Sequence, residues 1–394
     1  MNRTIVILSA KRTPMGGLQG SLAAKSAPEL GSIAIHGAME HCGLGTTAID
    51  EVYMGCVLPA GLKQAPARQA ALGAGIGEAT PTTTINKVCG SGMKAVMIAA
   101  DQIKTGNIDT AVAGGMESMS NAPYLLEKAR AGYRLGHQTM YDHMFTDGLE
   151  DAYDGQSMGV HAQNTADDYS LTREQMDAYA LESLKRAQHA IEQGHFVEEI
   201  TPVTIPQRRG DNITINDDEQ PGNARPDKIP TLRPAFKKDG SITAANASSI
   251  SDGASAMIIS HQEHAKTLSI KPLATIVDYC SHAQSPASFT CAPIGAIKKL
   301  LDRQQLTAED IDLVELNEAF ATVPLMAMHD IGFTHEQTNI SGGACALGHP
   351  LGSSGSRIIV TLLHNLIRTG KKRGLASLCI GGGEATAILI EVNE

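Results

Sequence analysis

One cysteine of this chain stands where a protein can make a thiol reactive. Cys89 follows a strand-like run over residues 82–88 and precedes a helix-like run over residues 92–105. The glycines at positions 90 and 92 let the chain turn sharply between these two elements. A thiol at a helix N-terminus lies at the positive end of the helix dipole, which favours the nucleophilic thiolate. Most free cysteines are small buried hydrophobic residues, so this position alone leaves both interpretations open.

A histidine and a second cysteine in the C-terminal third favour the chemical interpretation. His349 lies between Gly348 and Pro350, so its backbone is biased towards an extended form and the glycine leaves room for a substrate. Its imidazole could accept a thiol proton or donate to a developing oxyanion, although a lone histidine is more often structural. Cys379 precedes the run Ile380-Gly381-Gly382-Gly383, whose bare backbone N–H groups could face a carbonyl oxygen. That run lacks the Lys-Ser/Thr of a phosphate-binding P-loop.

Asn317 is a further candidate, because it ends the strand-like run over residues 311–316. Its amide could orient a water or a carbonyl, although an asparagine at a strand end more often forms a turn. Ligands of open α/β sheets bind at the carboxyl ends of the strands. We therefore expect Cys89, Asn317, His349 and Cys379 to meet at such an edge.

The elements that must position these residues occur twice in the chain. A strand over residues 4–8, a helix over 30–39 and a strand over 48–54 have counterparts over 274–277, 294–301 and 308–316. The two sets are about 260 residues apart. This repetition predicts a duplicated α/β fold of layered sheets and helices, and the short strand–helix–strand spacings predict mostly parallel sheets.

A segment of different character separates the two halves. It includes a strong amphipathic helix over residues 172–193, which begins at a capping box formed by Thr172 and Gln175, and polar loops over residues 207–240. We expect an N-terminal half of residues 1–120 together with about 246–270, a loop domain of residues 121–245, and a C-terminal half of residues 271–394.

Composition excludes several classes of protein. The net charge of -10 and the pI near 5.8 argue against a nucleic-acid partner. No run approaches about 18 uninterrupted apolar residues, so we expect no membrane span. The 7 cysteines are odd in number and contain no C-x-x-C pair, which disfavours a disulfide framework and a zinc site. A reducing cytoplasmic location is the expectation.

These runs, in chain order, resemble the thiolase family, and most closely its short-chain acetyl-CoA C-acetyltransferases (acetoacetyl-CoA thiolases). The resemblance covers essentially the whole chain. It rests on the runs SAKRTP at 9–14, KVCGSG at 87–92, AGGMESMS at 113–120, NEAF at 317–320, GHP at 348–350 and CIGGG at 379–383. It implies two βαβαβαββ halves in a layered α/β arrangement with an inserted loop domain.

The resemblance also implies catalytic roles. Cys89 would be the acylated nucleophile, and His349 would activate it and donate to a first oxyanion hole, where Asn317 holds a water. Cys379 would move a proton at the α-carbon of the substrate. The backbone N–H groups of Cys89 and Gly381 would form a second oxyanion hole.

Coenzyme A would be bound as a substrate and product, with no metal and no tightly bound cofactor. The residues implied to contact it or the acyl group are Leu149, Met158, Arg225, Ser248, Phe289 and Phe320. The loop domain would cover it, and residues 125–143 would form a tetramerisation loop, so the partners expected are acetyl-CoA, acetoacetyl-CoA, CoA and three further copies of the chain. Ser157 stands where many short-chain members have histidine, and Glu384 where glutamine is usual.

The implied reaction is the reversible condensation of two acetyl-CoA molecules to acetoacetyl-CoA and CoA through an acetyl-cysteine. A thiolate that attacks a thioester forms another thioester, so the transfer is nearly isoenergetic. One alternative is a degradative thiolase that cleaves longer 3-ketoacyl-CoA in a wider pocket. Another is a non-catalytic acyl-CoA- or lipid-binding relative, which loss of Cys89, His349 or Cys379 would mark; all three are present.

Overall fold

The structure, a computed structural model, describes residues 3–393 and is organised around a large mixed β-sheet. Hydrogen-bonded neighbours follow the order β12-β13-β14-β11-β1-β10-β5-β3-β4, and the short β2 pairs with β10. The strands of the first half are β1 (Ile5–Arg12), β2 (Gly16–Gly17), β3 (Glu51–Gly55), β4 (Thr82–Ile85), β5 (Thr110–Ser118) and β10 (Ser251–His261). Those of the second half are β11 (Ala274–Ala283), β12 (Leu313–Leu316), β13 (Arg373–Ile380) and β14 (Glu384–Val392).

The strand order confirms the predicted duplication. β1 and β11 pair antiparallel at the centre, with Val6 opposite Thr275. Outward from this pair, β10, β5 and β3 follow on one side, and β14, β13 and β12 follow on the other. The edge strand β4 has only a rudimentary counterpart, because Thr338 forms a single parallel bridge with Val314 of β12.

The prediction of mostly parallel sheets is wrong. Only β3 with β4, β3 with β5, and β12 with β13 are parallel, whereas β10 and β14 pair antiparallel with both of their neighbours in the main order. Strand–helix–strand spacing reveals the parallel pairs alone, because each of these needs a crossover helix. β14 follows β13 through a short turn at Gly381–Gly383, in which Gly382 and Gly383 have positive φ, whereas β10 pairs antiparallel with β5 only after the long segment that separates them in the chain.

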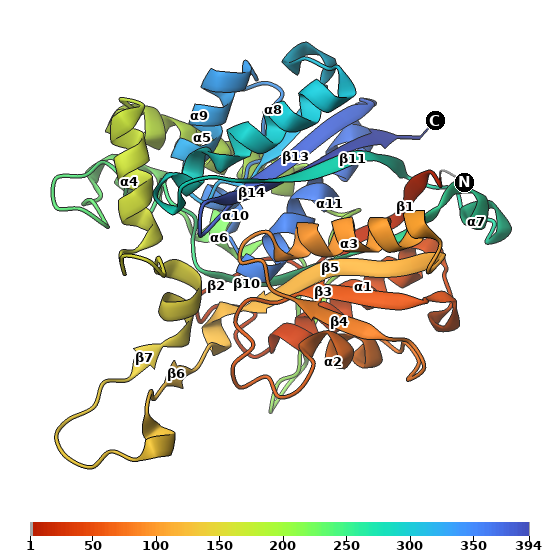
Figure 1. The fold of residues 1–394 in the computed structure, drawn as a ribbon, viewed down its shortest axis with the longest axis horizontal. Coiled ribbons are helices and arrows are strands. Elements are labelled where there is room, and N and C mark those ends of the chain that lie inside the picture. The colour runs from red at the N-terminus through yellow and green to blue at the C-terminus, as the bar shows by residue number, and fades with distance from the viewer. Residues whose placement is uncertain (1–2, 394) are drawn as a thin grey trace.

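Helices and strands alternate in layers, as Figure 1 shows. α3 (Ser91–Thr105) and α11 (Leu351–Thr369) pack against each other and against strands of both halves, so they form the central layer. Every residue of α11 from 351 to 366 is buried, as is typical of a helix enclosed on all sides. α1 (Ala27–Cys42) and α2 (Pro66–Gly73) cover the first half, and α8 (Ala292–Gln304) and α9 (Thr322–Ile331) lie over the second (Figure 1). The predicted layered α/β fold is confirmed.

The segment between β5 and β10 packs on both halves, with residues 158–192 against the second and residues 203–205 against the first, and includes an arm that projects from the body (Figure 1). The arm is residues 124–142, whose ends pair as β6 (Tyr124–Leu125) and β7 (Tyr141–Asp142). The rest of this segment contains α4 (Met158–Asp168), α5 (Arg173–Glu192), β8 (Val203–Ile205), β9 (Ile213–Ile215) and α6 (Glu219–Asn223). Two short helices lie outside it, α7 (Gln262–Thr267) after β10 and α10 (Ala344–Leu347) before α11. The capping box of Thr172 and Gln175 begins α5 as predicted. Within residues 3–393, no helix combines the length and apolar character needed to cross a bilayer.

Candidate active site

The turn that presents Cys89 is strained one residue before the cysteine. Val88 has a φ of 45°, a left-handed conformation that is unfavourable for a β-branched residue. Local hydrogen bonds hold it there, because the backbone N–H of Val88 donates to Asn86 Oδ1 (2.9 Å) and the Ser91 hydroxyl donates to the Val88 carbonyl (2.6 Å). The sharp turn therefore depends on Asn86 and Ser91 and not on the glycine after Cys89, since Gly90 is right-handed helical.

The glycines at 90 and 92 serve a different purpose from the one we expected. A Cβ at Gly90 would lie 2.4 Å from Cδ1 of Ile380, and one at Gly92 would lie 2.5 Å from Oγ of Ser356. Their lack of side chains lets the first turn of α3 approach β13 and α11 closely. The nucleophile turn of the first half thus touches the second half of the fold directly.

The structure corrects the expectation of a resting thiolate at Cys89. Burial raises the pKa of the Cys89 thiol to about 11, and a nearby backbone N–H of Gly381 offsets only part of that rise. The helix dipole is weaker here than we expected, because α3 begins two residues later, at Ser91. The thiol is therefore protonated in the free protein near neutral pH, and a nucleophilic role would require a base.

His349 is placed to be that base in its neutral form. Burial, and to a smaller extent the positive charge of Arg357, lower the pKa of His349 to about 3. Ser354 Oγ lies 2.5 Å from His349 Nδ1, and the same hydroxyl donates its only proton to the carbonyl of Pro350 (2.9 Å). The arrangement that satisfies both contacts of this hydroxyl has the imidazole proton on Nδ1, which donates it to Ser354. The unprotonated Nε2 can then accept a long hydrogen bond from Asn317 Nδ2 (3.5 Å) and is able to take a proton from a thiol.

Asn317 adjoins the free nitrogen of His349. Its Nδ2 lies 3.5 Å from His349 Nε2, and its Oδ1 is buried without a hydrogen-bond partner among the described residues. Its backbone N–H donates to the carbonyl of Ser377, which places it at the end of β12 beside β13. A buried amide oxygen without a protein partner is suited to hold a water or a polar ligand atom.

Cys379 and Gly381 approach the same point from the second half. Cys379 is completely buried on β13, and both burial and the proximity of Cys89 raise its pKa well above that of an ordinary thiol. The N–H of Gly381, in the turn after β13, faces the sulfur of Cys89. Two thiols, one imidazole and an aimed backbone N–H therefore converge where the two halves meet.

A cavity of about 420 Å³ opens onto this convergence. Cys89, His349 and Gly381 line it, and so do five of the residues predicted to contact substrate, namely Leu149, Met158, Ser248, Phe289 and Phe320. Arg225 is the exception, since it is exposed just before a short helix at Pro226–Thr231 and does not line the cavity. The apolar walls suit a long, flexible ligand that carries few charges near the reacting atoms.

Phe289 and a second phenylalanine surround the ring of Phe320. The Phe289 and Phe320 centroids are 6.4 Å apart, and those of Phe236 and Phe320 are 6.0 Å apart, both close to perpendicular. Phe236 occupies the space beside Gly159, where a Cβ would lie 2.2 Å from the ring. Sequence reasoning missed Phe236, because it lies in a polar loop whose folding over the cavity no local pattern reveals.

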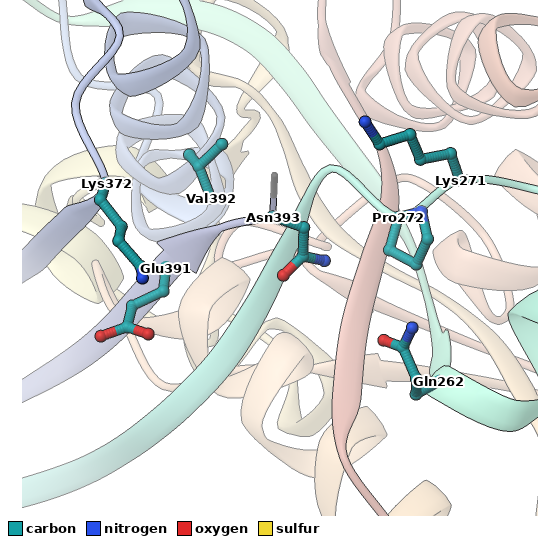
Figure 2. Close-up of a pocket in the computed structure, with 7 residues that line it drawn as sticks. All are labelled: Gln262, Lys271, Pro272, Lys372, Glu391, Val392 and Asn393. Carbon is teal, nitrogen blue, oxygen red and sulfur yellow. The ribbon is translucent and has the colours of Figure 1, made fainter.

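Other clusters and hollows of the molecule lie away from this site. Figure 2 shows a cavity of about 390 Å³ between the start of β11 and the end of β14, lined by Lys271, Lys372, Glu391 and uncharged neighbours. Two groups among the described residues could hold a metal ion: Asp109, His261 and His264, and Asp151, Asp154 and His161. Neither group shares a residue with the cavity that contains Cys89.

The fold and the convergent groups define an acyl-transfer site built on two thiols. An imidazole can deprotonate one thiol, backbone N–H groups can stabilise a developing oxyanion, and the second thiol can exchange a proton with bound substrate. The apolar cavity would hold the remainder of a long acyl carrier.

Comparison with known proteins agrees with this class. The family models “Thiolase, N-terminal domain” and “Thiolase, C-terminal domain” match residues 5–263 and 270–392. The acetyl-CoA acetyltransferase of Pseudomonas aeruginosa is 46% identical over 387 residues, which are 98% of each chain. The crystal structure of Acat5 thiolase from Ascaris suum in complex with coenzyme A is 42% identical and covers 99% of this chain and 100% of its own, with a TM-score of 0.94. The Bacillus anthracis acetyl-CoA acetyltransferase gives a TM-score of 0.97 at 39% identity, with 100% of both chains covered. This chain belongs to the thiolase family.

Proposed function

We propose that the chain is an acetyl-CoA C-acetyltransferase that interconverts two acetyl-CoA with acetoacetyl-CoA and CoA. The observation that carries the proposal is the convergence of Cys89, His349 and Gly381 at one end of an apolar cavity, with Cys379 buried near Cys89 just outside the lining. The names of the relatives and the coenzyme A in the Ascaris suum structure support the same substrate.

The first half-reaction acetylates Cys89. His349 Nε2 takes the thiol proton, and the thiolate attacks the thioester carbonyl of acetyl-CoA. The protonated Nε2, together with a water held by Asn317, stabilises the resulting oxyanion. The carbon–sulfur bond to CoA then breaks, and the CoA sulfur leaves with the proton from His349.

The second half-reaction forms the carbon–carbon bond. Cys379 first gives its thiol proton to the neutral His349, and the resulting thiolate removes a proton from the methyl group of a second acetyl-CoA. The enolate attacks the acetyl group on Cys89, and the Cys89 sulfur recovers the proton of His349 when the acetyl group leaves. The backbone N–H groups of Cys89 and Gly381 stabilise the new oxyanion, which collapses to acetoacetyl-CoA and frees the Cys89 sulfur. A single cysteine could not be acylated and act as a base at once, which explains the second thiol.

The cavity walls support binding of the pantetheine arm and a short acyl group. The pantetheine chain of coenzyme A would contact Leu149, Met158, Ser248 and Phe320, and Phe289 would close the end of the pocket that holds the acyl group. Arg225 would serve the coenzyme phosphates only beyond the cavity, since it lies outside the lining. No metal or tightly bound cofactor takes part in the proposed steps.

We also propose that the chain forms a homotetramer through the arm of residues 124–142. The arm exposes several large apolar side chains, and the exposed fraction of Leu135 is 94%. Apolar groups gathered on a projecting segment typically mark a protein interface. We further propose that the chain divides into two halves and a loop domain. We also propose that the protein is cytoplasmic, because its 7 cysteines are free thiols.

A thiolysis assay across 3-ketoacyl-CoA chain lengths tests the proposed function. Acetoacetyl-CoA should be cleaved with the highest kcat/KM. Equal or better cleavage of 3-ketooctanoyl-CoA would indicate a degradative thiolase of broader range. Absence of both thiolysis and acetyl-enzyme would indicate a non-catalytic acyl-CoA-binding protein.

A further inference from the structure

A buried carboxylate binds the chain next to His349. Glu117 is completely buried near the end of β5, and its Oε2 accepts hydrogen bonds from the backbone N–H groups of Val57 (2.9 Å) and Gly352 (2.8 Å). Its Oε1 accepts a third from Leu58 (3.1 Å). Gly352 is the second residue of α11, and only Pro350 and Leu351 separate it from His349. One side chain thus joins β5, the segment after β3, and the N-terminus of the helix that follows the candidate base.

The N-terminus of α11 lies in very close contact with elements of the nucleophile half. A Cβ at Gly115 would lie 1.9 Å from the carbonyl oxygen of Gly352, one at Gly55 would lie 2.7 Å from it, and one at Gly92 would lie 3.0 Å from it. These three glycines belong to strand β5, strand β3 and helix α3, respectively, and α3 is the helix that follows Cys89. Backbone packs on backbone at this junction, so a small shift of α11 must move against α3.

We propose that Glu117 is a positioning residue that sets the placement of His349 relative to Cys89. Its carboxylate holds the first turn of α11 against the junction through charge-assisted hydrogen bonds, and it complements the positive end of the α11 dipole. The inference rests on the proposed roles of Cys89 and His349 and deepens them. Glu117 itself does not line the cavity, so it acts through the helix and not on the substrate.

The environment of Glu117 supports this role. Burial raises its pKa to about 7, and the three backbone N–H donors oppose that rise. Removing the acceptor would leave three buried backbone N–H groups unsatisfied at the junction, which is unfavourable. The chain would relieve that cost by moving Gly352 or the segment after β3.

Glu117→Gln tests the inference, because glutamine keeps the shape of the side chain and one accepting oxygen. Its NH₂ group must face at least one backbone N–H, which should displace the first turn of α11. We expect the rate constant of Cys89 acetylation per titratable site to fall roughly 10–100-fold, since misplacements near 1 Å have effects of this size. KM for acetyl-CoA should stay within about twofold, because the cavity lining is unchanged, and Glu117→Ala should lose more than the glutamine variant.

Glu199→Gln is the matched control. Glu199 is also buried and also bonds to α11, through Thr361 (3.1 Å), but that contact lies about three turns beyond His349. It should lower thermal stability and leave the acetylation rate per site unchanged. Quenched-flow mass spectrometry of acetylated Cys89, normalised to the sites that finally react, separates a slower site from a smaller folded fraction.

Two outcomes would overturn the inference. One is a Glu117→Gln variant whose acetylation rate per site stays within twofold of the wild type while its melting temperature falls. If that variant cannot be isolated folded, Gly352→Ala perturbs the same junction from the other side. The second outcome that would overturn the inference is an unchanged rate of Cys89 acetylation per site in Gly352→Ala. A wild-type protein that never acetylates Cys89 would instead overturn the proposed function, and this inference with it.

Discussion

Ser354 accepts a hydrogen bond from His349 across 2.5 Å and passes its own proton to the carbonyl of Pro350. The direction of this short chain fixes the tautomer of a buried imidazole whose pKa is too low for protonation near neutral pH. The consequence is chemical, because only the tautomer with a bare Nε2 can take a proton from Cys89. A hydroxyl outside the cavity lining thereby decides which nitrogen of the imidazole can act as the base.

Ser354→Ala should therefore slow the first half-reaction. Without the hydroxyl, Nδ1 loses its partner, and the imidazole can rotate or adopt the other tautomer. We expect kcat/KM to fall roughly 10–100-fold, a part of the total contribution of a general base. Ser353→Ala is the control, since Ser353 is equally buried on α11 but bonds to Ser255 and not to His349. Equal losses in the two variants would show that only packing of α11 was disturbed.

The pH dependence of Cys89 alkylation should show a protonated thiol. Because burial raises the Cys89 pKa to about 11, the thiolate fraction in the free protein grows about tenfold per pH unit across the neutral range. The rate of iodoacetamide inactivation should therefore rise about tenfold per pH unit, or about a hundredfold between pH 7 and pH 9, without a plateau. A plateau near pH 7 would mean that Cys89 is already a thiolate and that its surroundings favour the charge. Peptide mapping must show that Cys89 carries the label.

The aromatic cluster should set the chain length of the substrate. Phe289 is buried against Phe320, so Phe289→Ala removes the end of the acyl pocket. We expect the ratio of kcat/KM for 3-ketohexanoyl-CoA to that for acetoacetyl-CoA to rise at least about tenfold, as the lost ring makes room for two methylenes. The variant should also lose about 3–5 kcal/mol of stability, and a ratio of substrates cancels any change in folded fraction. An unchanged ratio would locate the limit on chain length elsewhere, for example at Phe236.

Much of the fold could be predicted because local sequence patterns indicate its helices and strands, and these patterns occur twice in the chain. Hydrophobic periodicity and the capping box of Thr172 and Gln175 identified the elements, and their repetition identified the two halves. Strand direction could not be predicted so well. The antiparallel direction of β10 beside β5 and of β14 beside β13 depends on tertiary pairing, which produces no periodic pattern in the sequence.

The candidate site divides in the same way. Cys89, His349 and Cys379 could be proposed from residue type and adjacent glycines, and all of them lie at the junction of the halves. Ser354, Phe236 and Glu117 could not. Glu117 and Gly352, for instance, are 235 residues apart in the chain, so only the folded structure brings them together. The raised pKa of Cys89 could not be predicted from the sequence either. The helix dipole can be inferred from local pattern and would lower this pKa, whereas the burial that raises it depends on the tertiary structure.

The two cysteines should fail in different half-reactions. Cys89→Ala should abolish both the acetyl-enzyme formed from labelled acetyl-CoA and overall turnover, since Cys89 is the cysteine that lines the cavity together with His349 and Gly381. Cys379→Ala should still be acetylated, because the first transfer needs only Cys89, His349 and an oxyanion hole. It should then fail to condense, and it should not exchange the methyl protons of bound acetyl-CoA with solvent deuterium.

His349→Ala should slow acetylation, and the loss of one oxyanion donor alone lowers such rates by about 10²–10³. Cys42→Ala, at the end of α1 in the outer layer, controls for cysteine removal and should behave as the wild type. Covalent labelling of all four variants under the same conditions decides the matter, and acetylation of Cys89→Ala without acetylation of Cys379→Ala would mean that the two roles are reversed.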